Sequence, residues 1–193
     1  MTKPILLASL ASLAALAVAL PVAASAAPAN IVVVDNERIY AECNACRTAQ
    51  ASLQAQATTI QARQTALAAP LKTEAQALQA AADALAGKTP DTALQARATA
   101  FQAKQNSANQ ELQRLQQNLQ SSQANVLRQI NAKLGPAIKQ VMLAKGANLA
   151  IDMNNTLAVG AGMDVTADVL VALNAVLPSV SVTPGAAATT TGR

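Results

Sequence analysis

The stretch from Arg47 to Lys145 limits most strongly what this chain can fold into. Ala and Gln supply 43 of its 99 residues, so side chains with the bulk to fill a core are scarce. Large apolar residues recur in its first part at intervals of seven and four, at Leu53, Ile60, Leu67, Leu71, Leu78 and Leu85. Such spacing indicates a heptad stripe with one large residue per heptad. We therefore expect long helices that need partners.

A short turn divides this stretch into two helices. Gly87 suits the end of a helix, and Thr89-Pro90-Asp91 suits the start of the next one. The sequence thus predicts a first helix over Arg47–Ala86 and a second one from Thr92 to Lys145. A connection this short makes the two helices antiparallel neighbours. Pro70 and Gly135-Pro136 are expected to bend them locally.

The remainder of the chain predicts a small α/β base. Ile31–Val34 is a β-branched run typical of a buried strand. Asn148–Met153 and Thr156–Val159 are expected to form two more strands around a tight turn at Asn154-Asn155. A helix should follow Asp164 or Thr166.

The predicted fold is therefore mainly α: a long antiparallel coiled-coil hairpin (47–145) is inserted into a small α/β base of about three strands (27–46 and 146–177). Such a base is too small for a sizeable core, so several copies should assemble through it. The expected core of this trimerisation body consists of Ile31, Val33, Leu149, Ile151, Leu157, Leu170 and Leu173.

Both ends of the chain are expected to lie outside the fold. Residues 1–26 have a basic start, an apolar run and an A-x-A cleavage site at Ala24-Ser25-Ala26, which together predict a cleaved secretory signal peptide. The C-terminal residues 178–193 are rich in Pro, Gly, Ala and Thr, show no helical period, and are expected to be disordered.

Charge is distributed unevenly along the chain. Residues 47–145 carry 11 basic and 4 acidic side chains, whereas the rest of the chain after the signal has a net charge of −4. An exported protein rarely meets nucleic acid, and stacking aromatics are scarce. The interpretation is either a solvated basic face or a surface for acidic clients and anionic membrane. The basic arm residues are Arg63, Lys72, Lys88, Arg97, Lys104 and Arg114.

Little in the sequence predicts catalysis. There is no His, no phosphate-binding G-x-x-x-x-G-K-[ST] motif and no pair of neighbouring arm carboxylates, so neither enzyme activity nor a cofactor is expected. Cys43-Asn44-Ala45-Cys46 leaves three hypotheses open: a local or inter-subunit disulfide, a redox site, or a metal site shared between subunits. Asp35 and Arg38 are expected to pair with Asp152 or with a neighbouring subunit.

Four segments, taken in order, resemble the OmpH/Skp family of periplasmic chaperones: Val34–Ile39, Pro136–Ile138, Gly146–Asn154 and Asp164–Asn174. The resemblance implies a homotrimer in which a β-barrel-like body carries three helical hairpins around a cavity. It also implies an ATP-independent holdase that keeps unfolded outer-membrane proteins soluble in the periplasm, with a peripheral contact to anionic membrane or lipopolysaccharide. A structural coiled-coil adaptor of the envelope, without chaperone activity, is the alternative function.

Overall fold

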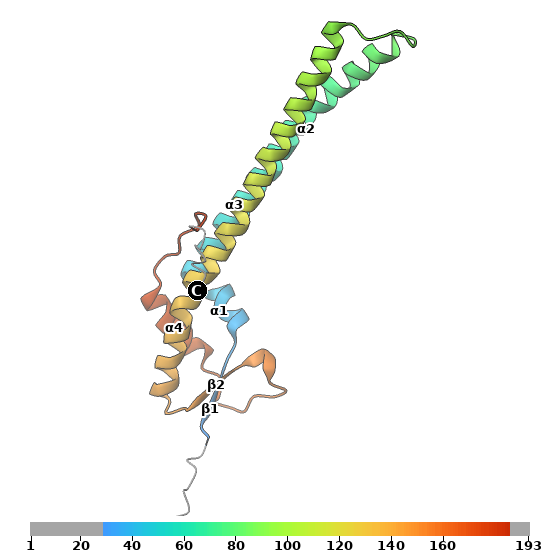
Figure 1. The fold of residues 1–193 in the computed structure, drawn as a ribbon. Helices are drawn as coiled ribbons and strands as arrows, with labels where there is room; N and C mark the ends of the chain where they lie inside the picture. Colours follow the sequence, from blue (N-terminus) through green and yellow to red (C-terminus); the bar gives the residue numbers. More distant parts are fainter. Residues whose placement is uncertain (1–28, 186–193) are drawn as a thin grey trace, which may run out of the picture.

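The computed structural model describes residues 29–185, which form a long helical arm on a small base (Figure 1). The predicted signal peptide lies outside the described residues, as do residues 186–193 of the predicted disordered tail. In chain order the elements are β1 (Ile31–Val34), α1 (Asn36–Glu42), α2 (Asn44–Asp83), α3 (Thr92–Ala144), β2 (Leu149–Asp152), a 3-10 turn η1 (Met153–Asn155) and α4 (Thr166–Val176).

The arm is the antiparallel pair of α2 and α3, as the sequence predicted. The helices contain 40 and 53 residues, which corresponds to lengths of roughly 60 and 80 Å. Asp91 begins α3 because its carboxylate accepts a hydrogen bond from the amide of Leu94 (2.8 Å). Both helices continue through their prolines, Pro70 and Pro136. Within residues 29–185, neither these helices nor any other is long and apolar enough to cross a membrane.

The base is built on a parallel pair of strands. β1 and β2 align Ile31 with Leu149 and Val34 with Asp152. The whole arm is the crossover between them, because parallel strands cannot be joined by a tight turn. At the end of the arm, Gly146 adopts a φ of +65° and reverses the chain after α3. The amide of Ala147 then donates to the carbonyl of Met142 (2.9 Å).

The predicted strand at Thr156–Val159 is wrong, because the described residues form a two-stranded sheet. The carboxylate of Asp152 accepts a hydrogen bond from the amide of Asn154 (2.8 Å), and this local turn leads into η1 instead of a hairpin. β1 finds a different third neighbour. The amide of Val33 donates a hydrogen bond to the carbonyl of Met163 (2.7 Å), and the amide of Val165 donates one to the carbonyl of Val33 (3.0 Å).

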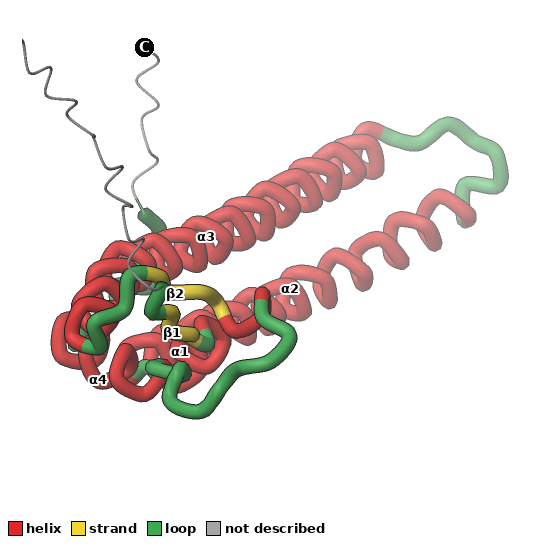
Figure 2. Tube along the Cα trace, turned by 90° about the horizontal axis from the view of Figure 1, so that it is seen from below, coloured by secondary structure: helices red, strands yellow, loops and turns green. Residues whose placement is uncertain are grey.

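One hydrophobic core joins the base to the lower end of the arm. Ile39 of α1 and Leu173 of α4 have no exposed surface, and Ile130 of α3 is 3% exposed. α4 packs against both α3 and α1. Seen from below, the short strands and α1 lie beside the lower ends of the long helices (Figure 2), and the upper ends of α2 and α3 move apart toward the loop at the tip (Figure 1).

The prediction that residues 178–193 are disordered is wrong for Ser179–Gly185. This segment, here called the C-terminal strap, turns back along the lower arm, where Val180 and Val182 pack against the core. Glutamine and asparagine side chains of the arm hydrogen-bond to its backbone. The composition of the strap concealed a two-residue alternation of Val with Ser or Thr, which is typical of an extended segment with one buried face.

Candidate functional site

The seam between α2 and α3 forms a long, partly apolar surface of the arm. All six large residues of the predicted heptad stripe, from Leu53 to Leu85, are half-buried. From residue 61 to residue 117, Ala108 alone is buried. Two helices without a third layer can cover only one side of each apolar side chain. The apolar residues of the upper arm therefore pack against each other between the two helices. Part of each side chain stays exposed and can contact another molecule.

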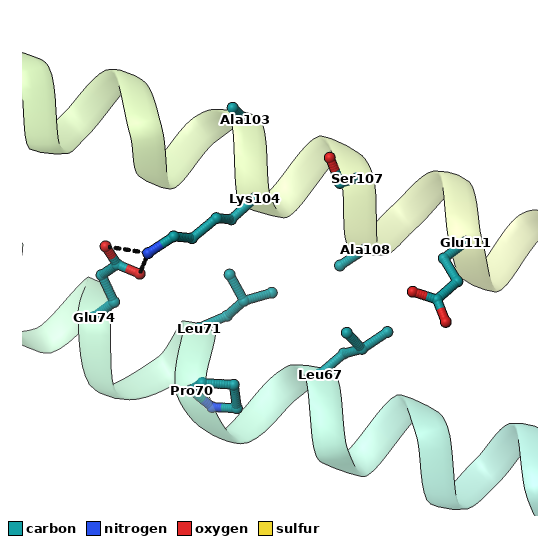
Figure 3. A pocket seen from close by; sticks show the side chains of 9 residues that line it. All are labelled: Leu67, Pro70, Leu71, Glu74, Ala103, Lys104, Ser107, Ala108 and Glu111. Carbon is teal, nitrogen blue, oxygen red and sulfur yellow. Dashed lines mark hydrogen bonds and ion pairs between the residues drawn. The ribbon is translucent and has the colours of Figure 1, made fainter.

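A cavity of about 500 Å³ opens in this seam beside Pro70. Figure 3 shows Leu67 and Leu71 of α2 and Ala108 of α3 pointing into the space between the helices. Short side chains on α3 leave the space that larger residues would fill. A second cavity of similar size lies nearer the tip, between Leu78 and Phe101. A third, lower on the arm, is bordered by the C-terminal strap.

Two of the predicted basic arm residues bridge the seam. The Arg63 guanidinium contacts both carboxylate oxygens of Glu111, at 2.7 and 3.0 Å, and the hydrogen bond lowers the pKa of that carboxyl. The Lys104 ammonium contacts Glu74 at 2.7 Å, on the edge of the cavity that Figure 3 shows. These two cations form ion pairs between α2 and α3. Both pairs are exposed to solvent, where ion pairs contribute little to stability.

The other four predicted basic residues are Lys72, Lys88, Arg97 and Arg114. All four are exposed, and none forms an ion pair with a residue among 29–185. Their charges are therefore available to an acidic client or an anionic surface. The structure thus divides the predicted basic residues into two that form ion pairs between α2 and α3 and four that are exposed without such a pair.

The two cysteines lie where the base meets the arm. Cys43 and Cys46 form a disulfide, and their side chains are 0% and 1% exposed. Cys43 ends α1 and caps α2, since its sulfur accepts a hydrogen bond from the amide of Cys46 (3.1 Å). Among residues 29–185, no group of three Cys, Asp or Glu side chains is placed to hold a metal ion. Burial keeps thiols in solution away from these sulfurs, so the arrangement favours a structural disulfide.

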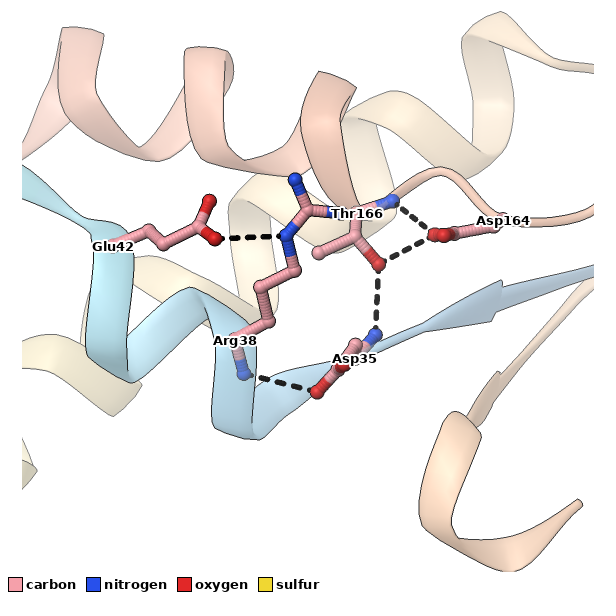
Figure 4. Close-up of polar contacts among 5 residues, drawn as sticks. All are labelled: Asp35, Arg38, Glu42, Asp164 and Thr166. Atoms are coloured by element: carbon pink, nitrogen blue, oxygen red, sulfur yellow. Dashed lines mark hydrogen bonds and ion pairs between the residues drawn. The ribbon is translucent and has the colours of Figure 1, made fainter.

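A polar network fixes β1 to the start of α4 (Figure 4). The Asp35 amide donates to the Thr166 hydroxyl (2.9 Å), and that hydroxyl donates to Asp164 (2.5 Å). The hydrogen bonds from Thr166 lower the pKa of Asp164, and the nearby charge of Arg38 adds to this effect.

The predicted pairing of Asp35 and Arg38 with Asp152 is wrong within the chain. Asp35 caps α1 by accepting from the Arg38 amide (2.9 Å), and the Arg38 guanidinium pairs with Glu42 (3.0 Å). Asp152 accepts instead from the side-chain amide of Asn36.

The predicted core of the trimerisation body divides into two groups within one chain. Val33, Leu170 and Leu173 are buried, and Ile31 and Ile151 are half-buried. Leu149 is 47% exposed and Leu157 is fully exposed. The single chain thus covers the α4 side of its base and leaves the outer face of β2 and the following loop uncovered.

The architecture defines a class: a long two-helix arm inserted between the strands of a small α/β base. The family model described as "Outer membrane protein (OmpH-like)" matches residues 30–173. The chain therefore belongs to the OmpH-like family, as the sequence segments indicated.

A solved structure shares this fold. It comes from Caulobacter crescentus CB15 and is described as OmpH-like, with a TM-score of 0.67 and 23% sequence identity to this chain. The match covers 81% of this chain and 90% of that one. A search of curated proteins found no match.

Proposed function

We propose that this protein is an ATP-independent periplasmic holdase for unfolded outer-membrane proteins. The half-buried apolar seam of the upper arm carries the proposal. Its residues offer many weak contacts over a long surface, and small side chains keep the arm itself soluble. A holdase needs such contacts, because it must bind chains of many sequences without trapping them.

We further propose that three copies assemble through the base, so that three arms surround a client. Four exposed apolar residues of the base support this assembly: Leu149, Leu157, Val171 and Val176. Within residues 29–185, no strand pairs with the outer edge of β2. Such an edge is a ready template for pairing with another chain.

The unpaired cations of the arm give the proposed interaction its expected salt dependence. They favour acidic clients and a peripheral contact with anionic membrane or lipopolysaccharide. Attraction between exposed charges is screened beyond roughly 10 Å at 0.1 M salt. Client binding should therefore weaken as salt rises, while the apolar part of the interaction persists.

The test is an aggregation assay without nucleotide. A urea-denatured outer-membrane β-barrel protein is diluted into buffer with and without the mature chain, and light scattering follows aggregation. We expect suppression at low salt. Absence of suppression, with a trimer verified by static light scattering, would overturn the holdase proposal. Capture of one folded envelope protein instead would favour the structural adaptor.

Two matched variants test the contribution of the arm charges. Lys72→Gln/Arg97→Gln removes two unpaired cations from the upper arm, and Lys133→Gln/Lys139→Gln removes two exposed cations near the base. Both pairs change the net charge equally. If the upper arm meets the client, the first variant should weaken suppression more than the second at low salt. Equal effects would mean that net charge alone matters.

A further inference from the structure

The C-terminal strap occupies the lower part of the α2–α3 seam as an extended peptide. Val180 and Val182 are half-buried against the core, and the intervening Ser181 is exposed, as is Thr183. Side chains at alternate positions thus face the arm, as they do along a β-strand. The strap lies beyond residues 30–173, the part that the family model matches.

The arm holds the strap by its backbone. The Gln129 side chain forms two hydrogen bonds with Ser181: its Nε2 donates to the carbonyl (2.9 Å) and its Oε1 accepts from the amide (3.1 Å). Asn125 donates to the carbonyl of Thr183 (3.1 Å), and Gln56 donates to that of Val182 (3.1 Å). A main-chain group is available at every residue, so this mode of binding does not depend on sequence.

The groove between α2 and α3 that holds the strap continues beyond it. A cavity of about 470 Å³ lies between Ile60 of α2 and Leu119 of α3, with Val182 on its border. Ser122 also lines this cavity; it is fully buried, and its hydroxyl has no hydrogen-bond partner among residues 29–185. A buried hydroxyl without a partner is unfavourable. A longer or better-fitting occupant could supply that partner from its own backbone.

We propose that this groove binds extended segments of client chains that place an apolar side chain at every second position, and that the strap is its resident competitor. The proposal rests on the proposed holdase function and deepens it by naming the recognised chemistry. Strands that span the outer membrane alternate apolar and polar residues in this way. Amide side chains that pair with any backbone, beside small apolar pockets, suit such segments whatever their sequence.

Competition from the strap sets the expected measurement. A site that is mostly closed by its own chain shows an apparent affinity reduced by the fraction that is open. The probe is a fluorescein-labelled peptide with the strap sequence, SVSVTPG, and the readout is fluorescence anisotropy with the full mature chain. Val180→Ser/Val182→Ser weakens the resident strap and leaves the groove intact. We expect this variant to bind the peptide about tenfold more tightly than the wild type does.

Two controls separate backbone capture from general stickiness. Adding Gln129→Ala to the double variant should abolish the gain in affinity, because it removes both hydrogen bonds to one residue of the peptide. A peptide of the same composition with adjacent valines, SSVVTPG, should bind weakly, since one valine must point away from the groove. Equal binding of both peptides, or equal affinity of wild type and double variant, would overturn the proposal.

A second readout covers the case in which the double variant folds poorly by circular dichroism. Benzoylphenylalanine at Thr59, which lines the cavity, should crosslink to the biotinylated SVSVTPG peptide, whereas the same group at the exposed Gln110 should not. Equal crosslinking at both positions would refute the assigned site. Peptide binding without suppression of aggregation would overturn the proposed holdase function but support the peptide-binding site. Suppression of aggregation without peptide binding would support the holdase function but overturn the peptide-binding site.

Discussion

The lower and upper halves of the arm share one sequence pattern and differ in their surroundings. Near the base, Val126, Ile130 and Leu134 of α3 are at most 5% exposed, because α1, α4 and the C-terminal strap add a third layer. From residue 61 to residue 117, equivalent positions are half-buried and Ala108 alone is buried. The heptad stripe therefore determines which residues contact each other across the two helices. The number of packed layers determines how deeply those residues are buried.

This difference indicates a division of labour. The base and lower arm contain the fully buried side chains and the disulfide, so they should carry most of the free energy of unfolding. The upper arm has few buried contacts, so its opening should cost less than global unfolding. Regions that bind variable partners commonly have such low local stability, as the upper arm is expected to have.

The largest expected effect comes from core truncation. Leu173→Ala, at a residue of α4 without exposed surface, should lower the free energy of unfolding by about 2–5 kcal/mol. Leu78→Ala, at a half-buried position of the upper arm, should cost about 1 kcal/mol or less. Urea unfolding followed by circular dichroism measures both. Equal costs would contradict the stability gradient along the arm.

Removing the disulfide should have the next largest effect. Cys43→Ala/Cys46→Ala releases the junction between α1 and α2 and should cost about 2 kcal/mol, because a short closed loop restricts the unfolded chain only moderately. The native wild type should also resist reduction by dithiothreitol, since both sulfurs are buried. Free thiols that appear as fast in the native as in the unfolded protein would contradict this structural role.

A smaller effect concerns the acid stability of the base. The folded state lowers the pKa of Asp164, so its stabilising contribution is present above the unfolded-state pKa and is lost as pH falls through the folded-state pKa. Asp164→Asn should therefore be less stable than the wild type at neutral pH, and the difference should shrink as pH falls below the unfolded-state pKa of the carboxyl. Denaturation midpoints across this range measure it. A gap that widens in acid would show that the sign is wrong.

The smallest effect is expected from the ion pairs of the upper arm. Arg63→Gln and Glu111→Gln change an exposed pair, so each should move the melting temperature only slightly, and less in high salt than in low salt. A double-mutant cycle isolates the coupling between the two side chains. A large coupling that persists in high salt would mean that this pair, rather than the apolar seam, holds the upper hairpin together.

Much of the fold and part of the site could be predicted from residue patterns. The heptad stripe and the turn before Asp91 predicted the hairpin, and Ile31–Val34 predicted the central strand. The third strand was misplaced, because Asp152 forms a side-chain turn with Asn154 that competes with a hairpin. The strap was missed because its composition suggested disorder, although its alternation of Val with Ser or Thr was a usable signal.

The sequence by itself determined the arm, because helix periodicity and capping are local and recur over a hundred residues. Only the tertiary structure decided which cations brace the seam, which strand edge stays open and where the strap lies. Those outcomes depend on contacts between residues far apart in the chain, such as Arg63 with Glu111 or Gln129 with Ser181. Local patterns contain no information about such pairs, since each partner alone resembles an ordinary exposed polar residue.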